Sequence, residues 1–133
     1  MAKTKLKGDI GQSMIMADIL RRGYKLAVPF GEDWDYDLIV LRNGIFQRIQ
    51  CKYTESKNGV VMVYCRSCNG WSLKKYSSET IDWMACYDAI TSTCYYIPAH
   101  LLGGGMSMLT LRLDAPKNNA TKNIRFANDY LAF

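Results

Sequence analysis

The 133-residue sequence carries 17 basic and 12 acidic residues, a net charge of +5, and 49% hydrophobic residues. This content suffices for one core, so we expect a single domain over residues 1–133 with a C-terminal tail over 114–133. No run approaches the roughly 18 apolar residues of a membrane span, and the lysine-rich start lacks the apolar segment of a signal peptide. We therefore expect an intracellular, cytoplasmic protein with no membrane partner. The basic excess fits a nucleic-acid partner or a mildly basic soluble protein.

Five cysteines, an odd number, stand in a chain for which no export is expected. Reduced, mostly buried thiols are the predicted state. Cys65 and Cys68 form a lone CxxC pair with no second pair or neighbouring histidine, so the sequence does not indicate a zinc site.

The first predicted element is a helix over residues 7–22. An apolar stripe follows helical spacing through Ile10, Met14, Ala17 and Leu20 or Arg21, and Ile15 and Ile19 widen it, which is typical of a helix packed on a core. Gly23 follows at the position where a left-handed residue ends many helices.

A strand over residues 24–28 is expected next, because polar and apolar residues alternate up to Pro29. An acidic loop over 31–35 leads into two β-prone segments that are separated by Asn43 and Gly44. Both residues tolerate the positive φ of a type I′ turn, so this stretch predicts a hairpin.

The second strand of this hairpin carries candidate site residues. Side chains alternate along a strand, so Arg48, Gln50 and Lys52 share one face. With Asp37 on the neighbouring strand, a carboxylate, an amide oxygen and a lysine converge. Such a set suits a divalent metal held against a phosphodiester, which indicates a nuclease site. The structural alternative is that Asp37 is a turn residue and that Gln50 and Lys52 lie on the solvated face of an ordinary hairpin.

A further strand is expected over residues 60–65, so that four strands form a mixed sheet with the first helix packed on one face. Residues 66–76 mix basic and aromatic types in a loop, which suits contacts to phosphate and to base or sugar. The candidate DNA contacts of this loop are Arg66, Lys74 and Lys75. The alternative is a solvated loop pinned by one buried tryptophan, Trp71.

Residues 81–87 and 94–97 predict two more strands, although a short helix over 78–84 competes for the first. A flexible turn over 101–105 and a strand over 106–113 complete the pattern. The polar tail beyond them has two interpretations. It is either a DNA-contacting arm through Lys117, Lys122 and Arg125, or a strap that docks Phe126, Tyr130 and Leu131 on a neighbouring subunit.

Six short motifs of this sequence resemble a known family. They are Lys7-Gly8-Asp9-Ile10-Gly11, Arg21-Arg22-Gly23-Tyr24, Pro29-Phe30-Gly31-Glu32-Asp33, Tyr36-Asp37-Leu38-Ile39-Val40, Gln50-Cys51-Lys52-Tyr53 and Asn69-Gly70-Trp71. Their order is similar to that of PD-(D/E)XK nucleases, and more closely to the branch that includes bacterial group I intron homing endonucleases. The resemblance implies an α/β, restriction-endonuclease-like fold with a mixed sheet flanked by helices.

The resemblance also implies a catalytic site that uses Mg²⁺ or Mn²⁺. Asp37 and the main chain of Cys51 would hold the metal. Gln50 stands where this branch accepts Gln in place of an acidic residue, and its side-chain oxygen would complete ligation or orient water. Lys52 would position the attacking water or stabilise the phosphate.

One position departs from the family pattern. Members usually carry a Glu directly after the residue that is Gly11 here, and this sequence has Gln12. An amide is a poorer ligand than a carboxylate for a hard cation because it brings no charge. We interpret Gln12 as an engineered change that stops cleavage and leaves DNA binding intact, so that a Glu at this position would be the second metal-binding carboxylate. Weak metal binding is the alternative.

The function implied by the resemblance is sequence-specific cleavage of double-stranded DNA by a homing-type endonuclease. A chain of this size covers only part of a long target site, so a homo-oligomer, either a dimer or a tetramer, is expected. Two alternatives stay open. One is a Holliday junction resolvase with the same catalytic core, and the other is a non-catalytic DNA-binding module that has kept the fold.

Overall fold

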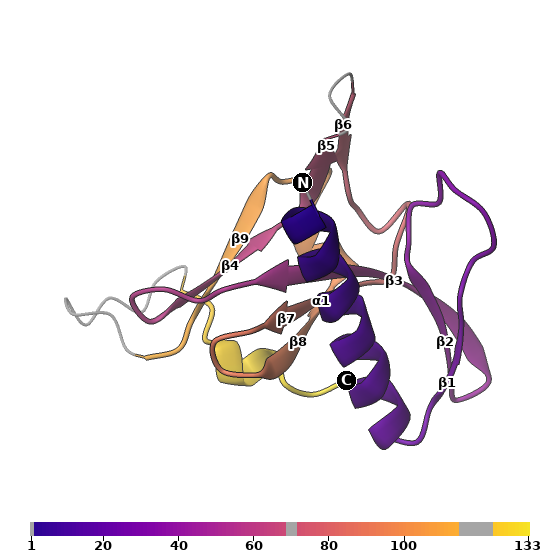
Figure 1. Ribbon diagram of the computed structural model, residues 1–133, viewed down its shortest axis with the longest axis horizontal. Coiled ribbons are helices and arrows are strands. Elements are labelled where there is room, and N and C mark those ends of the chain that lie inside the picture. The colour runs from indigo at the N-terminus through magenta and orange to yellow at the C-terminus, as the bar shows by residue number, and fades with distance from the viewer. Residues whose placement is uncertain (1, 69–71, 115–123) are drawn as a thin grey trace.

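A computed structural model describes residues 2–68, 72–114 and 124–133 of the chain. Its centre is a five-stranded mixed sheet in the order β1-β2-β3-β7-β8, with helix α1 packed on one face (Figure 1). The sheet strands are β1 (Lys25–Ala27), β2 (Leu38–Arg42), β3 (Ile45–Thr54), β7 (Trp83–Asp88) and β8 (Thr93–Pro98). Within the described residues, no helix has the length and apolar character needed to span a membrane.

Helix α1 (Ala2–Arg21) begins five residues before the predicted start and ends as expected before Gly23, which has φ +91°. Ile15 and Ile19 of the predicted stripe are fully buried. They pack against the odd-numbered residues Ile49 and Cys51 of β3, with Ala85 and Tyr87 of β7 beside them. Ile10 and Leu20 of the same stripe are 40% and 54% exposed, so the buried side of α1 is centred on Ile15 and Ile19 and the predicted stripe is only partly confirmed.

The predicted hairpin is confirmed as β2 and β3, which pair antiparallel from Leu38 opposite Ile49 to Arg42 opposite Ile45. Asn43 (φ 51°) and Gly44 (φ 77°) form the turn. Two consecutive residues with positive φ match the right-handed twist of the flanking strands, and this explains why Asn-Gly is placed here.

Strands β7 and β8 form the second predicted hairpin, and β7 joins the sheet parallel to β3. The competing helix over 78–84 does not form, because Ser77 to Thr80 make a turn and β7 starts at Trp83. Tyr95 and Tyr96 of β8 are buried on opposite faces of the sheet, as expected for core residues.

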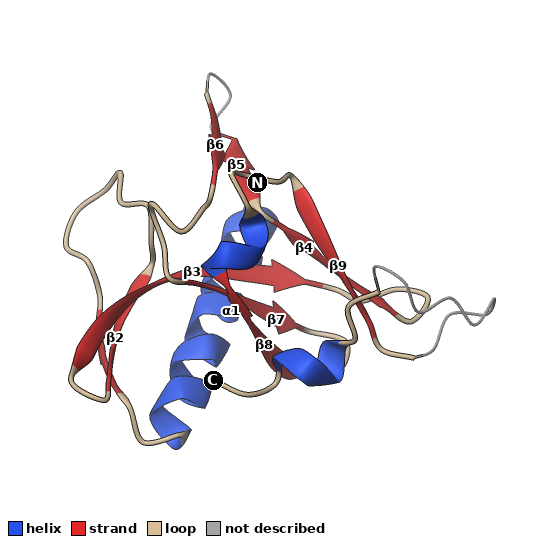
Figure 2. Ribbon diagram, turned by 180° about the vertical axis from the view of Figure 1, so that it is seen from behind, coloured by secondary structure: helices blue, strands red, loops and turns tan. Residues whose placement is uncertain are grey.

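The strand expected at 60–65 forms as β4 (Val60–Tyr64), but it does not join the central sheet. It pairs antiparallel with β9 (Met108–Arg112) in a separate two-stranded sheet. Val61 and Val63 of β4, with Leu109 and Leu111 of β9, cover the face of the central sheet opposite α1 (Figure 2). The predicted four-stranded sheet is therefore wrong in this strand, and among the described residues no α-helix covers this second face. The short 3-10 helix η1 (Ala99–Leu102) packs there too.

The stretch expected to be a basic loop is a hairpin made of β5 (Arg66–Cys68) and β6 (Leu73–Lys75). It projects from the body of the molecule beside the N-terminus (Figure 1). The alternative that rested on Trp71 lies outside the described residues. The hairpin stands on the core through Cys65, whose amide donates to Ser107 and whose carbonyl accepts from the Tyr76 amide.

The C-terminal residues 124–133 fold back on their own chain. Phe126 bridges to Arg112, and the 3-10 helix η2 (Ala127–Tyr130) packs on the core beside β8. Phe133 stacks on the Tyr96 ring at 4.4 Å between centroids. Tyr130 likewise packs against the core of its own chain.

Candidate active site

The candidate site lies where β2 and β3 separate. The amide of Asp37 donates to the Ile49 carbonyl at 2.8 Å, one step before β2 begins at Leu38. Beyond this point no strand of the described residues pairs with β3 on the β2 side. The Asp37 side chain fills the first gap, since its Oδ2 accepts the Cys51 amide at 3.1 Å. A side chain thus replaces the main-chain acceptor that a longer β2 would have supplied.

The main-chain carbonyl of Cys51 points into the same gap. The Arg48 carbonyl accepts from the Asp82 amide and the Thr54 carbonyl accepts from the Ala89 amide, and these two donors flank β7. The Ile49 carbonyl instead accepts from the Asp37 amide, on the β2 side. Main-chain groups alternate sides along a strand, so odd-numbered residues of β3 direct their polar groups toward β2. The Cys51 carbonyl therefore faces the gap beside Asp37, and the side-chain Nε2 of Gln50 lies 3.5 Å from the Cys51 carbonyl oxygen.

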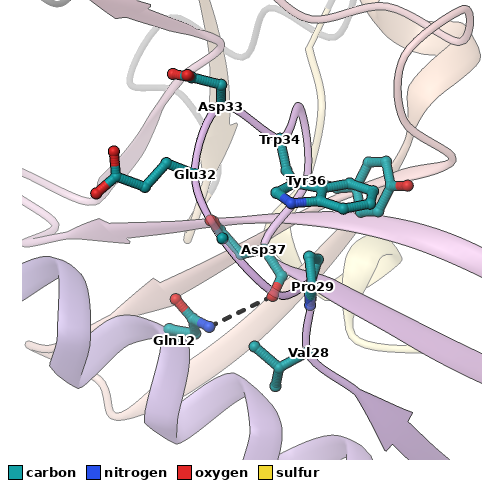
Figure 3. Close-up of a pocket in the computed structure, with 9 residues that line it drawn as sticks. Gln12, Val28, Pro29, Glu32, Asp33, Trp34, Tyr36 and Asp37 are labelled. Carbon is teal, nitrogen blue, oxygen red and sulfur yellow. Dashed lines mark hydrogen bonds between the residues drawn. The ribbon is translucent and has the colours of Figure 1, made fainter.

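Three side chains approach this gap from different layers. Gln12 comes from α1, and its Nε2 lies 3.4 Å from the Asp37 carbonyl oxygen (Figure 3). Gln50 and Lys52 come from the face of β3 opposite α1, because Ile49 and Cys51 occupy the helix face. The four predicted catalytic residues thus surround the end of β2, as the alternation predicted for Gln50 and Lys52.

Gly11 explains how Gln12 comes so close. A Cβ added at Gly11 would lie 3.0 Å from Tyr53 Cβ and 3.4 Å from the Lys52 carbonyl oxygen. The absence of a side chain at Gly11 lets α1 cross β3 at this separation without displacing Tyr53. The next residue along the helix is consequently held over the gap.

Lys52 is fixed by the β5–β6 hairpin. Its Nζ donates to the Arg66 carbonyl at 3.0 Å and to Ser67 Oγ at 3.2 Å, and it lies 5.4 Å from the Tyr76 ring centroid. This excludes the structural alternative in which Lys52 points freely into solvent. Gln50 is only 8% exposed, so it does not lie on a solvated face either.

The pKa values of Asp37 and Lys52 shift in opposite directions from their ordinary values. Burial raises the pKa of the Asp37 carboxyl, against the stabilising Cys51 amide and the Lys52 charge. Burial likewise lowers the pKa of the Lys52 ammonium, and the Asp37 charge opposes this. Both groups are therefore held with less water than an exposed side chain, where charge stabilisation at a phosphate is most effective.

A cavity of about 300 Å³ opens on the Gln12 side of the gap. The acidic loop between β1 and β2 supplies one wall, and Glu32 and Asp33 of this loop line the cavity with Gln12 and Asp37 (Figure 3). The sequence concentrates its acidic residues at Glu32, Asp33, Asp35 and Asp37, which suggested a metal-holding pocket there.

The residues of this gap fit a divalent cation of the hard class in their donor type. Asp37 has a second carboxylate oxygen, and the Cys51 carbonyl faces it; both are oxygen donors of the kind Mg²⁺ and Mn²⁺ prefer. The candidate ligands supply little negative charge, because Gln12 and Gln50 add only neutral amide oxygens. Among the described residues, no three His, Cys, Asp or Glu side chains cluster as metal ligands.

The predicted DNA contacts fall in two regions. Arg66, Lys74 and Lys75 lie on the β5–β6 hairpin, where Arg66 stands directly opposite Lys75. Lys74 is paired with Asp35 at 3.0 Å, and within the described part of the chain neither Arg66 nor Lys75 has an acidic partner. Arg125 lies beside Arg112, and the Arg125 carbonyl accepts a hydrogen bond from the Arg112 amide. Lys117 and Lys122 lie outside the described residues.

Comparisons with known proteins agree with this geometry. A family model described as PD-(D/E)XK endonuclease matches residues 2–133. Among solved structures, the chain is similar to a bacterial homing endonuclease, I-Ssp6803I, with a TM-score of 0.74 and 23% sequence identity over 96% of this chain and 87% of that chain. This likeness confirms the α/β, restriction-endonuclease-like fold. A comparison with curated proteins finds no match.

Proposed function

Because this chain belongs to the PD-(D/E)XK endonuclease family, we propose that it is a divalent-metal-dependent, sequence-specific DNA endonuclease of the homing type. One observation carries the proposal: the Asp37 carboxylate and the Cys51 main chain meet where β2 begins, with Lys52 close enough for the two charges to interact. A carboxylate, a carbonyl oxygen and a cation at one opening of a sheet suit phosphodiester hydrolysis.

Each residue of the gap has a distinct role in this proposal. Asp37 and the Cys51 carbonyl would hold Mg²⁺ or Mn²⁺, and the Gln50 side-chain oxygen would complete the set or orient water. When bound, the metal supplies positive charge at the phosphate and makes water more acidic. Lys52 donates to the attacking water or to a phosphate oxygen.

Gln12 limits the activity of this sequence. Its amide stands beside Asp37 but brings no negative charge, so Asp37 is the only carboxylate among the four proposed catalytic residues. A Glu at this position would add the second charge that a hard cation requires. We therefore expect the chain to bind DNA and to cleave it poorly.

The β5–β6 hairpin is the proposed DNA-contacting surface. Arg66 and Lys75 face each other across its strands, an arrangement that like-charge repulsion disfavours and a phosphate would relieve. Lys74 joins them on the same hairpin. Lys117, Lys122 and Arg125 of the tail extend the proposed contacts.

A homo-oligomer, dimer or tetramer, is part of this proposal because cutting both strands of a duplex needs two active sites. The likeness to a bacterial homing endonuclease supports the homing role over that of a junction resolvase. A resolvase would instead prefer four-way junctions irrespective of sequence.

Cleavage of supercoiled plasmids with Mg²⁺ tests the proposal, with plasmids that carry a library of candidate target sites. The variants to compare are the present sequence, Gln12→Glu, and Gln12→Glu combined with Lys52→Ala. We expect Gln12→Glu to linearise plasmids at a defined sequence and the double variant to be inactive. Cleavage of junctions alone would favour the resolvase, and DNA binding without cleavage by Gln12→Glu would favour a non-catalytic module.

A further inference from the structure

The β5–β6 hairpin does more than offer cations to DNA, because its side chains hold Lys52. The Ser67 hydroxyl accepts from Lys52 Nζ at 3.2 Å and lies 2.7 Å from the Tyr76 hydroxyl. Tyr76 is only 3% exposed, and its ring stands beside the Lys52 ammonium. Lysine, serine and tyrosine therefore form a continuous hydrogen-bonded row from β3 to the base of the hairpin.

We infer that Ser67 and Tyr76 are positioning residues that orient the Lys52 ammonium for DNA hydrolysis, so that the β5–β6 hairpin is part of the active site. This inference rests on the proposed function of Lys52. It assigns a catalytic purpose to a hairpin that the sequence linked to DNA contact only.

The count of hydrogen-bond donors supports an oriented ammonium. A lysine ammonium has three N–H donors and accepts no hydrogen bonds. Within the described residues, one is directed to the Arg66 carbonyl and one to Ser67 Oγ. Two fixed donors define the direction of the third, which is left for a water molecule or a phosphate oxygen.

Ser67 is in turn held by a rigid neighbour. Its hydroxyl has one proton and two acceptor sites, so it can accept from Lys52 and still bond to Tyr76. The Tyr76 amide donates to the Cys65 carbonyl, and Cys65 is fully buried in the core. A lysine side chain has four rotatable bonds, and this anchored row removes much of that freedom before the substrate arrives.

The test uses the full chain and begins without DNA. Nζ signals of ¹⁵N-lysine-labelled protein are recorded by NMR for the unmodified chain, Ser67→Ala, Ser67→Thr and Tyr76→Phe, and Lys52→Arg assigns the Lys52 signal. We expect an ordered Lys52 ammonium in the unmodified chain and in Ser67→Thr, which keeps the hydroxyl. Ser67→Ala should make it mobile. A Lys52 signal of unchanged mobility in Ser67→Ala overturns the inference.

The second measurement links this order to cleavage. In a Gln12→Glu background, Ser67→Ala should lower the single-turnover cleavage rate about 10- to 100-fold, the usual loss when a reacting group is misplaced. The DNA dissociation constant measured with Ca²⁺ should stay within about two-fold, and Ser67→Thr should restore the rate.

Ser13→Ala on the exposed side of α1 is the matched control and should change neither quantity. An unchanged rate in Ser67→Ala with weaker DNA binding would show that Ser67 serves binding, and the inference would fail. If Gln12→Glu itself cuts no DNA, the proposed function fails, whereas the NMR result still decides whether Ser67 orders Lys52.

Discussion

The Asp37 carboxylate accepts the main-chain amide of Cys51 at 3.1 Å, at the point where β2 leaves β3. Burial raises the pKa of this carboxyl more strongly than the amide and Lys52 lower it. In an Asp whose pKa is raised on folding, ionisation costs stability once the pH exceeds the ordinary Asp value near 4. The residue proposed to hold the metal is therefore a source of instability at neutral pH.

Asp37→Asn should for this reason stabilise the protein at pH 7 by about 0.5–2 kcal/mol. The Asn oxygen still accepts the Cys51 amide, and the buried charge is gone. The gain should vanish below pH 4, where both folded and unfolded chains carry a protonated Asp37. Thermal unfolding at several pH values measures it, with the exposed Asp9→Asn as control. A lower melting temperature of Asp37→Asn at pH 7 would contradict this account.

Gln12→Glu should raise the affinity for Mn²⁺ at least about ten-fold, because a second carboxylate joins Asp37 beside the gap. Isothermal titration without DNA measures this directly. Gln12→Met, of similar length but without an oxygen, is the matched control and should bind no better than the present chain. Equal Mn²⁺ affinity of Gln12→Glu and the present chain would remove Gln12 from the metal site.

Gly11→Ala and Gly8→Ala should change stability in opposite directions, although both replace a glycine of α1. Nothing lies within 4 Å of a Cβ at Gly8, so alanine there should stabilise the helix by about 0.5–1 kcal/mol. At Gly11 the added methyl meets Tyr53 at 3.0 Å, and the cost should reach about 1–3 kcal/mol. Urea unfolding of both variants checks the pair. A stabilised Gly11→Ala would mean that α1 does not approach β3 as closely as described.

Asp35→Asn should tighten DNA binding about two- to five-fold at low salt, because it releases Lys74 from its ion pair. Lys74→Ala should weaken binding and reduce the slope of log K against log salt by about one. Binding assays at several salt concentrations measure both, and in the double variant the benefit of Asp35→Asn should disappear. If Asp35→Asn still tightens binding without Lys74, the effect is general charge and not this pair.

Asp88→Ala should be the most destabilising of these changes, with a loss of about 2–4 kcal/mol. Asp88 is fully buried and accepts from the Ser56 amide, the Ile90 amide and the Thr91 hydroxyl. Burial raises its pKa, but these donors outweigh burial and leave the pKa below the ordinary value. The stability it supplies is thus present above pH 4 and is lost as the pH falls through the lowered pKa. Urea unfolding at pH 7 checks the loss, and the exposed Asp129→Ala should change little.

Local patterns were sufficient for the parts of the fold that depend on neighbours in sequence. Asn43 and Gly44 fixed the register of β2 and β3, and the alternation of side chains along β3 put Gln50 and Lys52 on one face. The apolar stripe predicted helix α1 and included Ile15 and Ile19, which are buried, but it also included Ile10 and Leu20, which are exposed. In each case the chain's own periodicity determines the geometry, and no distant partner is required.

The sequence could not predict which distant segments would pair. The alternation over Val60–Tyr64 indicates a strand, but it does not reveal that the partner is Met108–Arg112, some 50 residues away, and not the central sheet. The same limit hid the contact between Lys52 and Ser67. Ser67 lies 15 residues beyond Lys52. The sequence Asn69-Gly70 between the two strands could have indicated a hairpin here, but no local pattern shows that this hairpin lies against Lys52.

Cys51 illustrates how one residue can belong to two parts of the molecule. Its thiol packs into the core under α1, and its main chain faces the gap beside Asp37. Among substitutions at position 51, only proline would remove the main-chain N–H, and none would remove the carbonyl. Mutational scanning at this position would consequently report how well the core is packed and would miss the site altogether.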